Sequence, residues 1–438
     1  SQGIILYTDA VQKTQSVSFT KRGTADVTAE VTLNGNTIDK IYCGESLLQA
    51  GTNYTVDGGK LTFKATWLDT LSAGDYTLTL HYNPLGEKYV SGDGSNDAPA
   101  TTSITLKVQK ATGSVMNLSD ISKVYDGKVV SDVTYNKLST GSVAVEYKLR
   151  GADDNTYTSN KPYAVGKYTV RVMVAADGNY TEARATADFD ITYLSPPADP
   201  FDLSGTQGDN GWYTSDVTIT PPEGYTVSSA LNGKYSDSLI ISASTENVSV
   251  YLKNEQGQMT DAVSVGNIKI DKDAPAITVS GNTNNYLKRD TVKITASDST
   301  SGIAKVEVKK DGGEFVDITD SYKSGYTVAE NGTYKFRVTD NAGRTEETAL
   351  EYNRIDTQKP VVTIDATHGG ETYTSGIWTH ESVILTPENE TANLGTTTYQ
   401  YRVDGGDWQE YISSVAISTD TDHDGTVYEF KAISGSGG

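Results

Sequence analysis

The chain has 438 residues, which is too long for one small domain and predicts several units. Lys and Arg total 36 against 57 Asp and Glu, so the net charge is −21, and we expect no binding to nucleic acid and none to an anionic membrane surface. The 28 tyrosines and 41 glycines, among many alternating threonines and valines, are typical of half-buried strands and tight turns. The composition therefore predicts an all-β protein.

Two further features narrow the class of protein. The single cysteine, Cys43, cannot form an internal disulfide, and it is expected to be a small buried or half-buried apolar residue. No apolar run approaches the roughly 20 residues that span a bilayer, so no membrane insertion is expected. No charged and then apolar segment precedes Ile4, so we expect a targeting segment to be either absent or outside the given sequence.

A glycine, a tyrosine and an alternating strand recur along the chain. Alternation with period two predicts that one face of each strand is buried. In immunoglobulin-like sandwiches a tyrosine at the start of the sixth strand hydrogen-bonds back to the preceding turn, an arrangement called the tyrosine corner. The three candidates are Gly74-Asp-Tyr76, Gly166-Lys-Tyr168 and Gly332-Thr-Tyr334.

A second repeat marks the junctions between units. Ile270-Asp-Lys-Asp-Ala-Pro275 and Ile355-Asp-Thr-Gln-Lys-Pro360 are 360 − 275 = 85 residues apart, which fits one sandwich. Hairpin turns are expected at the Asp-Gly-Gly sequences beginning at Asp57, Asp311 and Asp404, and no segment has helical periodicity. We predict tandem immunoglobulin-like β-sandwiches in an elongated multidomain rod, with units 1–110, 111–195, 196–272, 273–357 and 358–438.

The fifth unit is expected to lack its last strand. From Gly257 to Pro275 there are 18 residues, and from Gly343 to Pro360 there are 17, whereas one residue follows Gly437. The sixth strand would then be an open edge, so edge-strand pairing at the C-terminal unit is expected in an otherwise monomeric rod.

The first unit contains Asn53-Tyr-Thr-Val-Asp-Gly58 and Trp67-Leu-Asp-Thr-Leu71, in that order. Over roughly residues 17–110 it resembles the X-two modules of cellulases and cellulosomal scaffoldins, which are immunoglobulin-like modules catalogued as carbohydrate-binding. The insert from Gly86 to Thr102 departs from that pattern.

The other units resemble repeats of bacterial surface proteins. Lys123-Val-Tyr-Asp-Gly127 and Gly178-Asn-Tyr180 make the second unit similar to the MBG or YDG repeat. Asp298-Ser-Thr-Ser-Gly-Ile303 and Thr339-Asp-Asn-Ala-Gly343 make the last three similar to bacterial immunoglobulin-like domains of secreted Gram-positive proteins. The resemblance implies a location outside the cell, at the cell surface or in the cell wall.

One segment has the spacing of a calcium loop. Asp420, Asp422 and Asp424 supply oxygen ligands at positions one, three and five, and Gly425 follows, but position twelve is Lys431 where a bidentate glutamate is needed. Calcium is therefore the one candidate cofactor, but a solvated turn at Asp424-Gly425 is the preferred interpretation, so no cofactor is expected.

The junction acids Asp271 and Asp273, with Asp298 and Asp340, resemble the calcium-rigidified linkers of cadherins, but they lack the glutamates that complete such sites. Turn and linker solvation is the preferred interpretation of these acids.

No catalytic site is expected. The four histidines have no Cys, Ser or carboxylate at a spacing that suggests a triad or a zinc site, so the chain is predicted not to be an enzyme. Trp67, Trp212, Trp378 and Trp408 are expected to pack structurally, in preference to stacking on sugars.

Two functions from different classes remain open. The first, which the sequence favours, is a non-catalytic stalk or adhesin segment of a secreted or wall-anchored bacterial protein, which spaces or presents binding sites, with mucin or a host surface glycoprotein among the expected partners. The second is a carbohydrate-binding accessory region of an extracellular polysaccharide-degrading enzyme, with a polysaccharide as partner.

Overall fold

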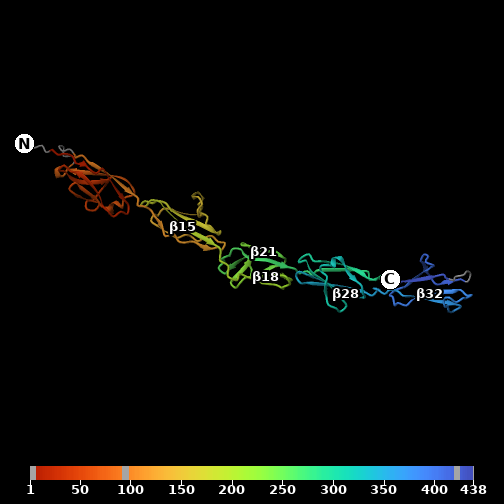
Figure 1. Cartoon of the computed structure of the whole chain (residues 1–438). Helices are drawn as coiled ribbons and strands as arrows, with labels where there is room; N and C mark the ends of the chain where they lie inside the picture. The colour runs from red at the N-terminus through yellow and green to blue at the C-terminus, as the bar shows by residue number, and fades with distance from the viewer. Residues whose placement is uncertain (1–5, 91–97, 419–424, 438) are drawn as a thin grey trace, which may run out of the picture. The chain divides into compact units, whose positions relative to one another are not determined.

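The computed structural model describes residues 6–90, 98–418 and 425–437. Within these residues no helix has the length and apolar character needed to cross a bilayer. The chain divides into two compact units: one holds residues 1–196 and 253–261, and the other holds residues 197–252 and 262–438. Strand β15 belongs to the first unit, and β18, β28 and β32 belong to the second (Figure 1).

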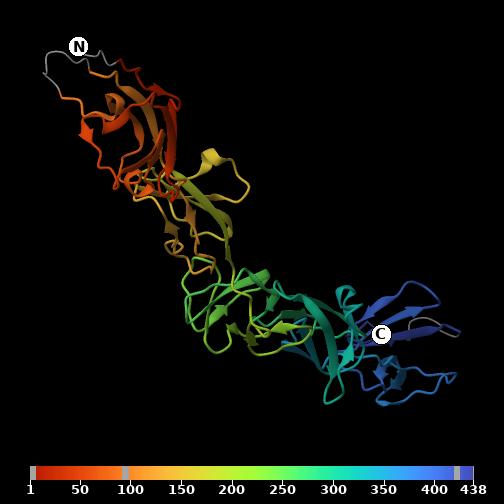
Figure 2. The same ribbon diagram turned by 90° about the vertical axis from the view of Figure 1, so that its left-hand side faces the viewer.

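In the first sandwich, red to orange in Figure 2, two mainly antiparallel sheets pack face to face. Their orders are β1-β3-β7-β6 and β2-β9-β8-β4-β5. Its elements are β1 (Val11–Gln12), β2 (Ser16–Thr20), β3 (Val27–Thr32), β4 (Thr37–Cys43), β5 (Ser46–Leu47), β6 (Tyr54–Asp57), β7 (Lys60–Phe63), α1 (Ala65–Leu68), β8 (Gly74–Asn83), the 3-10 turn η1 (Pro84–Gly86) and β9 (Thr102–Gln109).

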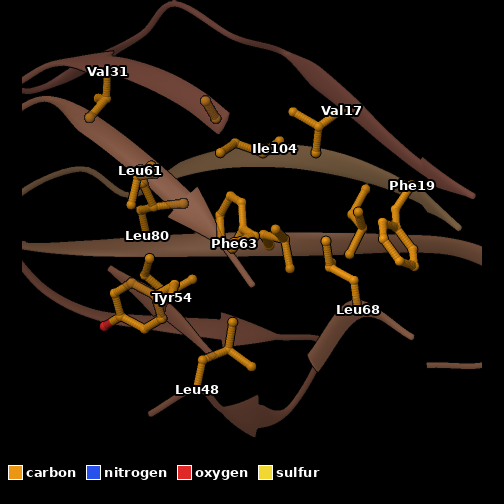
Figure 3. Packing of buried hydrophobic residues seen from close by; sticks show 14 of the residues in the cluster. Val17, Phe19, Val31, Leu48, Tyr54, Leu61, Phe63, Leu68, Leu80 and Ile104 are labelled. Carbon is orange, nitrogen blue, oxygen red and sulfur yellow. The ribbon is translucent and has the colours of Figure 1, made fainter. Parts of the chain in front are cut away.

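Side chains from both sheets fill the space between them (Figure 3). Phe19 and Leu80 from one sheet and Leu61 and Phe63 from the other are at most 3% exposed. Each contributes about 1.5 to 3 kcal/mol by burial, because its apolar surface leaves water. This core holds the five-stranded sheet in place, so that its other face is open to solvent.

No helix was expected from the sequence, but the structure has one short helix, α1, in this sandwich. It spans four residues, too few to show a helical period in the sequence. Its first N–H, from Ala65, is satisfied by the Asp26 carboxylate at 2.8 Å. This hydrogen bond is the main reason that the pKa of Asp26 lies below its usual value.

The second sandwich, in the same unit, has sheets β10-β12 and β11-β15-β14-β13. Residues 253–261, which begin at the end of β21 (Thr245–Asn254), also belong to this unit. Within the unit, the N–H of Met259 donates to the carbonyl of Tyr125 at 2.8 Å. The elements are β10 (Val115–Met116), β11 (Lys123–Val124), β12 (Asn136–Lys137), β13 (Val143–Leu149), η2 (Asp154–Thr156), β14 (Gly166–Val174) and β15 (Ala183–Thr192).

The third sandwich has sheets β16-β18-β20 and β17-β22-β21-β19. Val217, Ile219, Val250 and Leu252 alternate along their strands and are fully buried, as the period of two predicts. The elements are β16 (Asp202–Ser204), β17 (Trp212–Tyr213), β18 (Val217–Thr220), β19 (Tyr225–Ser228), β20 (Leu239–Ile241), β21 (Thr245–Asn254) and β22 (Val263–Ile270).

The fourth sandwich has sheets β23-β24-β27 and β26-β25-β28-β29, with β28 paired on both sides. Its elements are β23 (Ala276–Ser280), β24 (Asp290–Ser297), β25 (Ile303–Lys310), β26 (Val316–Asp317), η3 (Tyr322–Ser324), β27 (Tyr326–Val328), β28 (Gly332–Asp340) and β29 (Thr345–Tyr352).

The fifth sandwich has sheets β31-β30-β32-β35 and β34-β33-β36. Strand β36, which corresponds to β28, lies at the edge of its sheet among the described residues. The elements are β30 (Val362–His368), β31 (Glu371–Thr372), β32 (Val383–Asn389), β33 (Thr398–Val403), β34 (Gln409–Tyr411), β35 (Val415–Ile417) and β36 (Tyr428–Ile433).

Two local predictions are confirmed. The Asp-Gly-Gly sequences lie in turns between β6 and β7, β25 and β26, and β33 and β34, and Asp311 and Asp404 adopt positive φ values of 50° and 48°. Each predicted corner tyrosine donates its hydroxyl to the backbone carbonyl four residues upstream. The bonds are Tyr76 to Ser72 at 2.9 Å, Tyr168 to Ala164 at 3.0 Å and Tyr334 to Glu330 at 3.0 Å.

Candidate functional site

The calcium loop predicted from the sequence, Asp420, Asp422 and Asp424, lies outside the described residues. Lys431, which stands at its twelfth position, is on β36, with its Nζ 4.4 Å from the centre of the Trp408 ring. The calcium prediction for that loop therefore stays a prediction.

The structure brings together a different set of acids. Asp271 follows β22, Asp298 follows β24, and Asp340 is the last residue of β28. One carboxylate oxygen from each lies within 4.8 Å of the others. We call these three residues the aspartate trio. The fourth acid named from the sequence, Asp273, is exposed and enters only through its backbone N–H, which donates to Asp271 at 3.1 Å.

The trio is held in place by main-chain N–H groups. Asp298 accepts three of them through one oxygen, from Thr300, Ser301 and Gly302 at 2.7 to 3.0 Å. The other oxygen of Asp271 accepts the N–H of Ser301 at 3.1 Å. The local sequence thus forms a tight turn that points its amides at two of the three carboxylates.

The third carboxylate is not fully satisfied. Asp340 is 1% exposed, and its Oδ1 accepts the N–H of Arg344 at 2.9 Å. Its Oδ2 is buried and has no hydrogen-bond partner. Burial raises the pKa of Asp340, and the charges of Asp271 and Asp298 raise it further.

No basic side chain neutralises the trio: among the described residues, no Lys, Arg or His nitrogen forms an ion pair with it. Two unit charges 4.8 Å apart repel by at least roughly 3.5 kcal/mol at an effective dielectric constant of about 20. Three such charges, two of them on buried residues, need a positive group that the side chains do not supply.

The next junction has the same positions with different chemistry. Asp356, 85 residues after Asp271, is 3% exposed. Asn389 stands six residues after buried Val383, as Asp298 stands six after buried Val292, and Ser434 takes the place of Asp340 four residues after Phe430. The positions of the trio are therefore Asp, Asn and Ser at this junction.

Neutral donors satisfy the single acid there. Asp356 Oδ2 accepts the side-chain amide of Asn393 and the N–H of Leu394, both at 3.0 Å. Its Oδ1 accepts the N–H of Gln358 at 3.0 Å. One carboxylate with three N–H donors has no comparable charge to neutralise.

The four tryptophan side chains differ in how far they are buried. Trp67 packs on the core of the first sandwich, 6.1 Å from Phe63, and Trp408 lies between Arg402 and Lys431, 4.7 and 4.4 Å from its ring centre. The expectation of packing is wrong for Trp378, which is 84% exposed in the connection between β31 and β32. Trp212 is half-buried in β17 beside Lys269.

Neither Cys43 nor the described histidines form a cluster with catalytic geometry. Cys43 is half-buried on β4 and packs on the core, and burial raises the pKa of its thiol. His368 Nδ1 lies 3.8 Å from Glu381, and the ring contacts Tyr373. His81 lies on the outer face of the first sandwich.

That outer face belongs to the five-stranded sheet. Ile41 and Leu80 point into the core, so their neighbours Tyr42 and His81 point outward, with ring centres 5.4 Å apart. Lys40 Nζ lies 5.8 Å from the Tyr42 ring centre. Four directly opposed residues on neighbouring strands run across this face: Leu47, Tyr42, Thr79 and Ser103.

We call these four residues the Tyr42 row. At about 4.8 Å per strand it is roughly 14 Å long. Leu47 is 58% exposed and Tyr42 half-buried. The row is flanked by hydroxyls on β2 and β9, at Ser16, Ser18 and Thr105. A sheet face with an exposed aromatic edge and many hydroxyls can stack on and hydrogen-bond to an extended polar chain. The row was not predicted from the sequence, although the alternation around Ile41 and Leu80 is its signal.

Two known proteins are similar to parts of this chain. A xyloglucanase from a Paenibacillus species is 29% identical over 158 residues, which is 35% of this chain and 12% of that protein. Cellulose-binding protein A from Clostridium cellulovorans is 41% identical over 59 residues, 14% of this chain and 3% of that protein. The chain thus spans a small part of the length of these relatives.

Solved structures with similar folds have low TM-scores. A tri-modular endo-beta-1,4-glucanase from Bacillus licheniformis, complexed with cellotetraose, is 17% identical, with 42% of this chain and 38% of that chain covered and a TM-score of 0.19. The N-terminal eight Ig domains of Down Syndrome Cell Adhesion Molecule are 11% identical, with 98% and 60% covered and a TM-score of 0.26. Neither alignment carries an argument about function.

The family comparison supports one of the resemblances named from the sequence. The similarity of residues 17–110 to X-two modules is confirmed over most of that range, whereas the MBG or YDG and Gram-positive surface resemblances stay predictions. Residues 12–89 match the family model described as Carbohydrate binding domain X2.

Proposed function

We propose that the chain is a carbohydrate-binding accessory region of an extracellular polysaccharide-degrading protein, with the Tyr42 row as its binding surface. The observation that carries the proposal is the match of residues 12–89 to a carbohydrate-binding family, because the row lies almost wholly inside that range. The names of the two relatives, a xyloglucanase and a cellulose-binding protein, favour a plant-type β-glucan as the ligand. The accessory role is thus favoured over the stalk or adhesin.

The chemistry of the row fits a glycan better than a protein partner. Sugar rings have an apolar face and an edge of hydroxyl groups. The Tyr42 ring supplies a surface for the apolar face, and the hydroxyls of Thr79 and Ser103 supply hydrogen bonds to the edge. A chain of sugars lying across the strands would contact all four residues of the row.

Retention of the full chain on cellulose and on immobilised xyloglucan tests this proposal. We expect the unmodified chain to bind at least one of them, and Tyr42→Ala to weaken binding by about tenfold or more, because a central aromatic contact is lost. Trp378→Ala is the matched control, since Trp378 is an exposed aromatic residue outside the first sandwich. Absence of binding by the unmodified chain would refute the function; an equal loss in both variants would refute the site.

A spacer role for the later sandwiches is a second candidate, and a specific contact favours it. The N–H of Asp209 in the third sandwich donates to the carbonyl of Ala342 in the fourth at 3.0 Å, and the amide of Asn210 donates to the carbonyl of Asn341 at 3.0 Å. Such bonds between neighbouring sandwiches would limit their relative motion. Cell-wall anchoring and binding of mucin or host glycoproteins belong to this candidate.

A further inference from the structure

The aspartate trio has two properties that together point to a bound cation. It gathers three carboxylates within 4.8 Å, and among the described residues no Lys, Arg or His nitrogen forms an ion pair with them. Independently, the Oδ2 atom of Asp340, on a residue 1% exposed, has no hydrogen-bond donor. A buried acceptor without a donor is rare in folded proteins, and a bound ion is one of its ordinary explanations.

We propose that Asp271, Asp298 and Asp340 bind one divalent metal ion, and that the ion is calcium. All three ligands are hard carboxylate oxygens, which calcium prefers and which zinc, with its preference for nitrogen and sulfur, does not. Calcium takes six to eight oxygens at flexible angles, so carbonyl groups of the surrounding turns and water can complete its shell. Magnesium needs a stricter octahedron and keeps more of its water, so it is expected to bind more weakly.

The second junction acts as an internal comparison. Asp356, Asn389 and Ser434 hold the corresponding positions, and there amide donors satisfy the one carboxylate. Where a metal is proposed, two more acids are present, and the third of them, Asp340, has one carboxylate oxygen without a hydrogen-bond donor. The same backbone arrangement thus carries a charged version and a neutral version, and only the charged one requires an ion.

The position of the trio gives the ion a mechanical role. Asp271 directly follows the last strand of the third sandwich, while Asp298 and Asp340 belong to the fourth. An ion bound to all three would fasten the end of one sandwich to two loops of the next. Calcium would therefore stiffen this junction and leave the following one unchanged.

Isothermal titration calorimetry on the full chain, after removal of metal with EDTA, tests the proposal. We expect calcium to bind at the trio, and magnesium about tenfold or more weakly. Asp298→Asn and Asp340→Asn, which keep the side-chain shape, should each weaken calcium binding by about tenfold or more. Circular dichroism checks that both variants remain folded.

Two control variants make the outcome decisive. Asp356→Asn changes the equivalent acid of the second junction and should leave calcium binding unchanged. The triple variant Asp420→Asn, Asp422→Asn and Asp424→Asn removes the loop predicted from the sequence and should leave the trio's binding in place. The proposal is overturned if the unmodified chain binds no calcium, or if folded Asp298→Asn and Asp340→Asn variants bind it as well as the unmodified chain does.

Discussion

The fourth and fifth sandwiches follow one strand pattern but bury very different amounts of it. Among the described residues, twelve hydrophobic side chains form the buried core of the fourth and three form that of the fifth. Strand β28 is covered on one edge by β29, whereas β36 has β33 as its strand partner. The alternating sequence therefore determines which side of a strand faces inward, and neighbouring strands determine how completely it is buried.

The largest expected contrast lies in the matched phenylalanines. Phe336 is fully buried, so Phe336→Ala should destabilise the fourth sandwich by about 3 to 5 kcal/mol. Phe430 is only half-buried, and Phe430→Ala should cost the fifth sandwich clearly less, because a smaller cavity forms. Hydrogen exchange, measured by mass spectrometry on peptides from β28 and β36, gives each local stability. Equal losses would contradict the difference in burial.

A smaller contrast is expected between the cross-strand ion pairs of the two sandwiches. Glu307, with a side chain 6% exposed, contacts Lys305 at 2.6 Å and Arg337 at 2.7 Å. Glu307→Gln should destabilise the fourth sandwich by about 1 to 3 kcal/mol, because two part-buried cations lose their partner. Glu429, which pairs with Arg402, is 41% exposed, and Glu429→Gln should have a smaller effect that salt weakens further. Thermal melting of each variant at low and high salt measures both losses of stability and how salt changes them.

The smallest effect concerns pH. Burial raises the pKa of Glu307, but the hydrogen bonds and charges of Lys305 and Arg337 outweigh it, so its pKa in the folded state lies below its ordinary value of 4.5. Because the folded-state pKa is lowered, ionised Glu307 contributes its full stabilisation above pH 4.5. That contribution is lost as the pH falls through the folded-state pKa. We expect β28 to lose stability between neutral pH and about pH 3, and this loss to shrink in Glu307→Gln. An unchanged pH profile in the variant would count against the pairing.

The sequence predicted the periodic parts of the fold and little of the sites. The tyrosine corners were predictable because Gly332 and Tyr334 fix both the turn and the hydrogen bond to Glu330. Trp378 was predicted wrongly, because its place before a strand does not reveal whether another strand covers it. Asp298 and Asp340 were named with the junction, yet their 4.8 Å approach depends on how two loops 42 residues apart fold together (340 − 298).

The positions of the cross-strand ion pairs in these two sandwiches have a consequence for folding. Glu307 on β25 faces Arg337 on β28, whereas in the fifth sandwich Arg402 on β33 faces Glu429 on β36. If β33 paired by mistake with β28, with Phe336 in the place of Phe430, Arg402 would face Lys335 in place of Glu429. Gln400 would then face Arg337 in place of Glu307, so both ion pairs would be lost. The different positions of the two ion pairs thus discourage neighbouring repeats from exchanging strands while they fold.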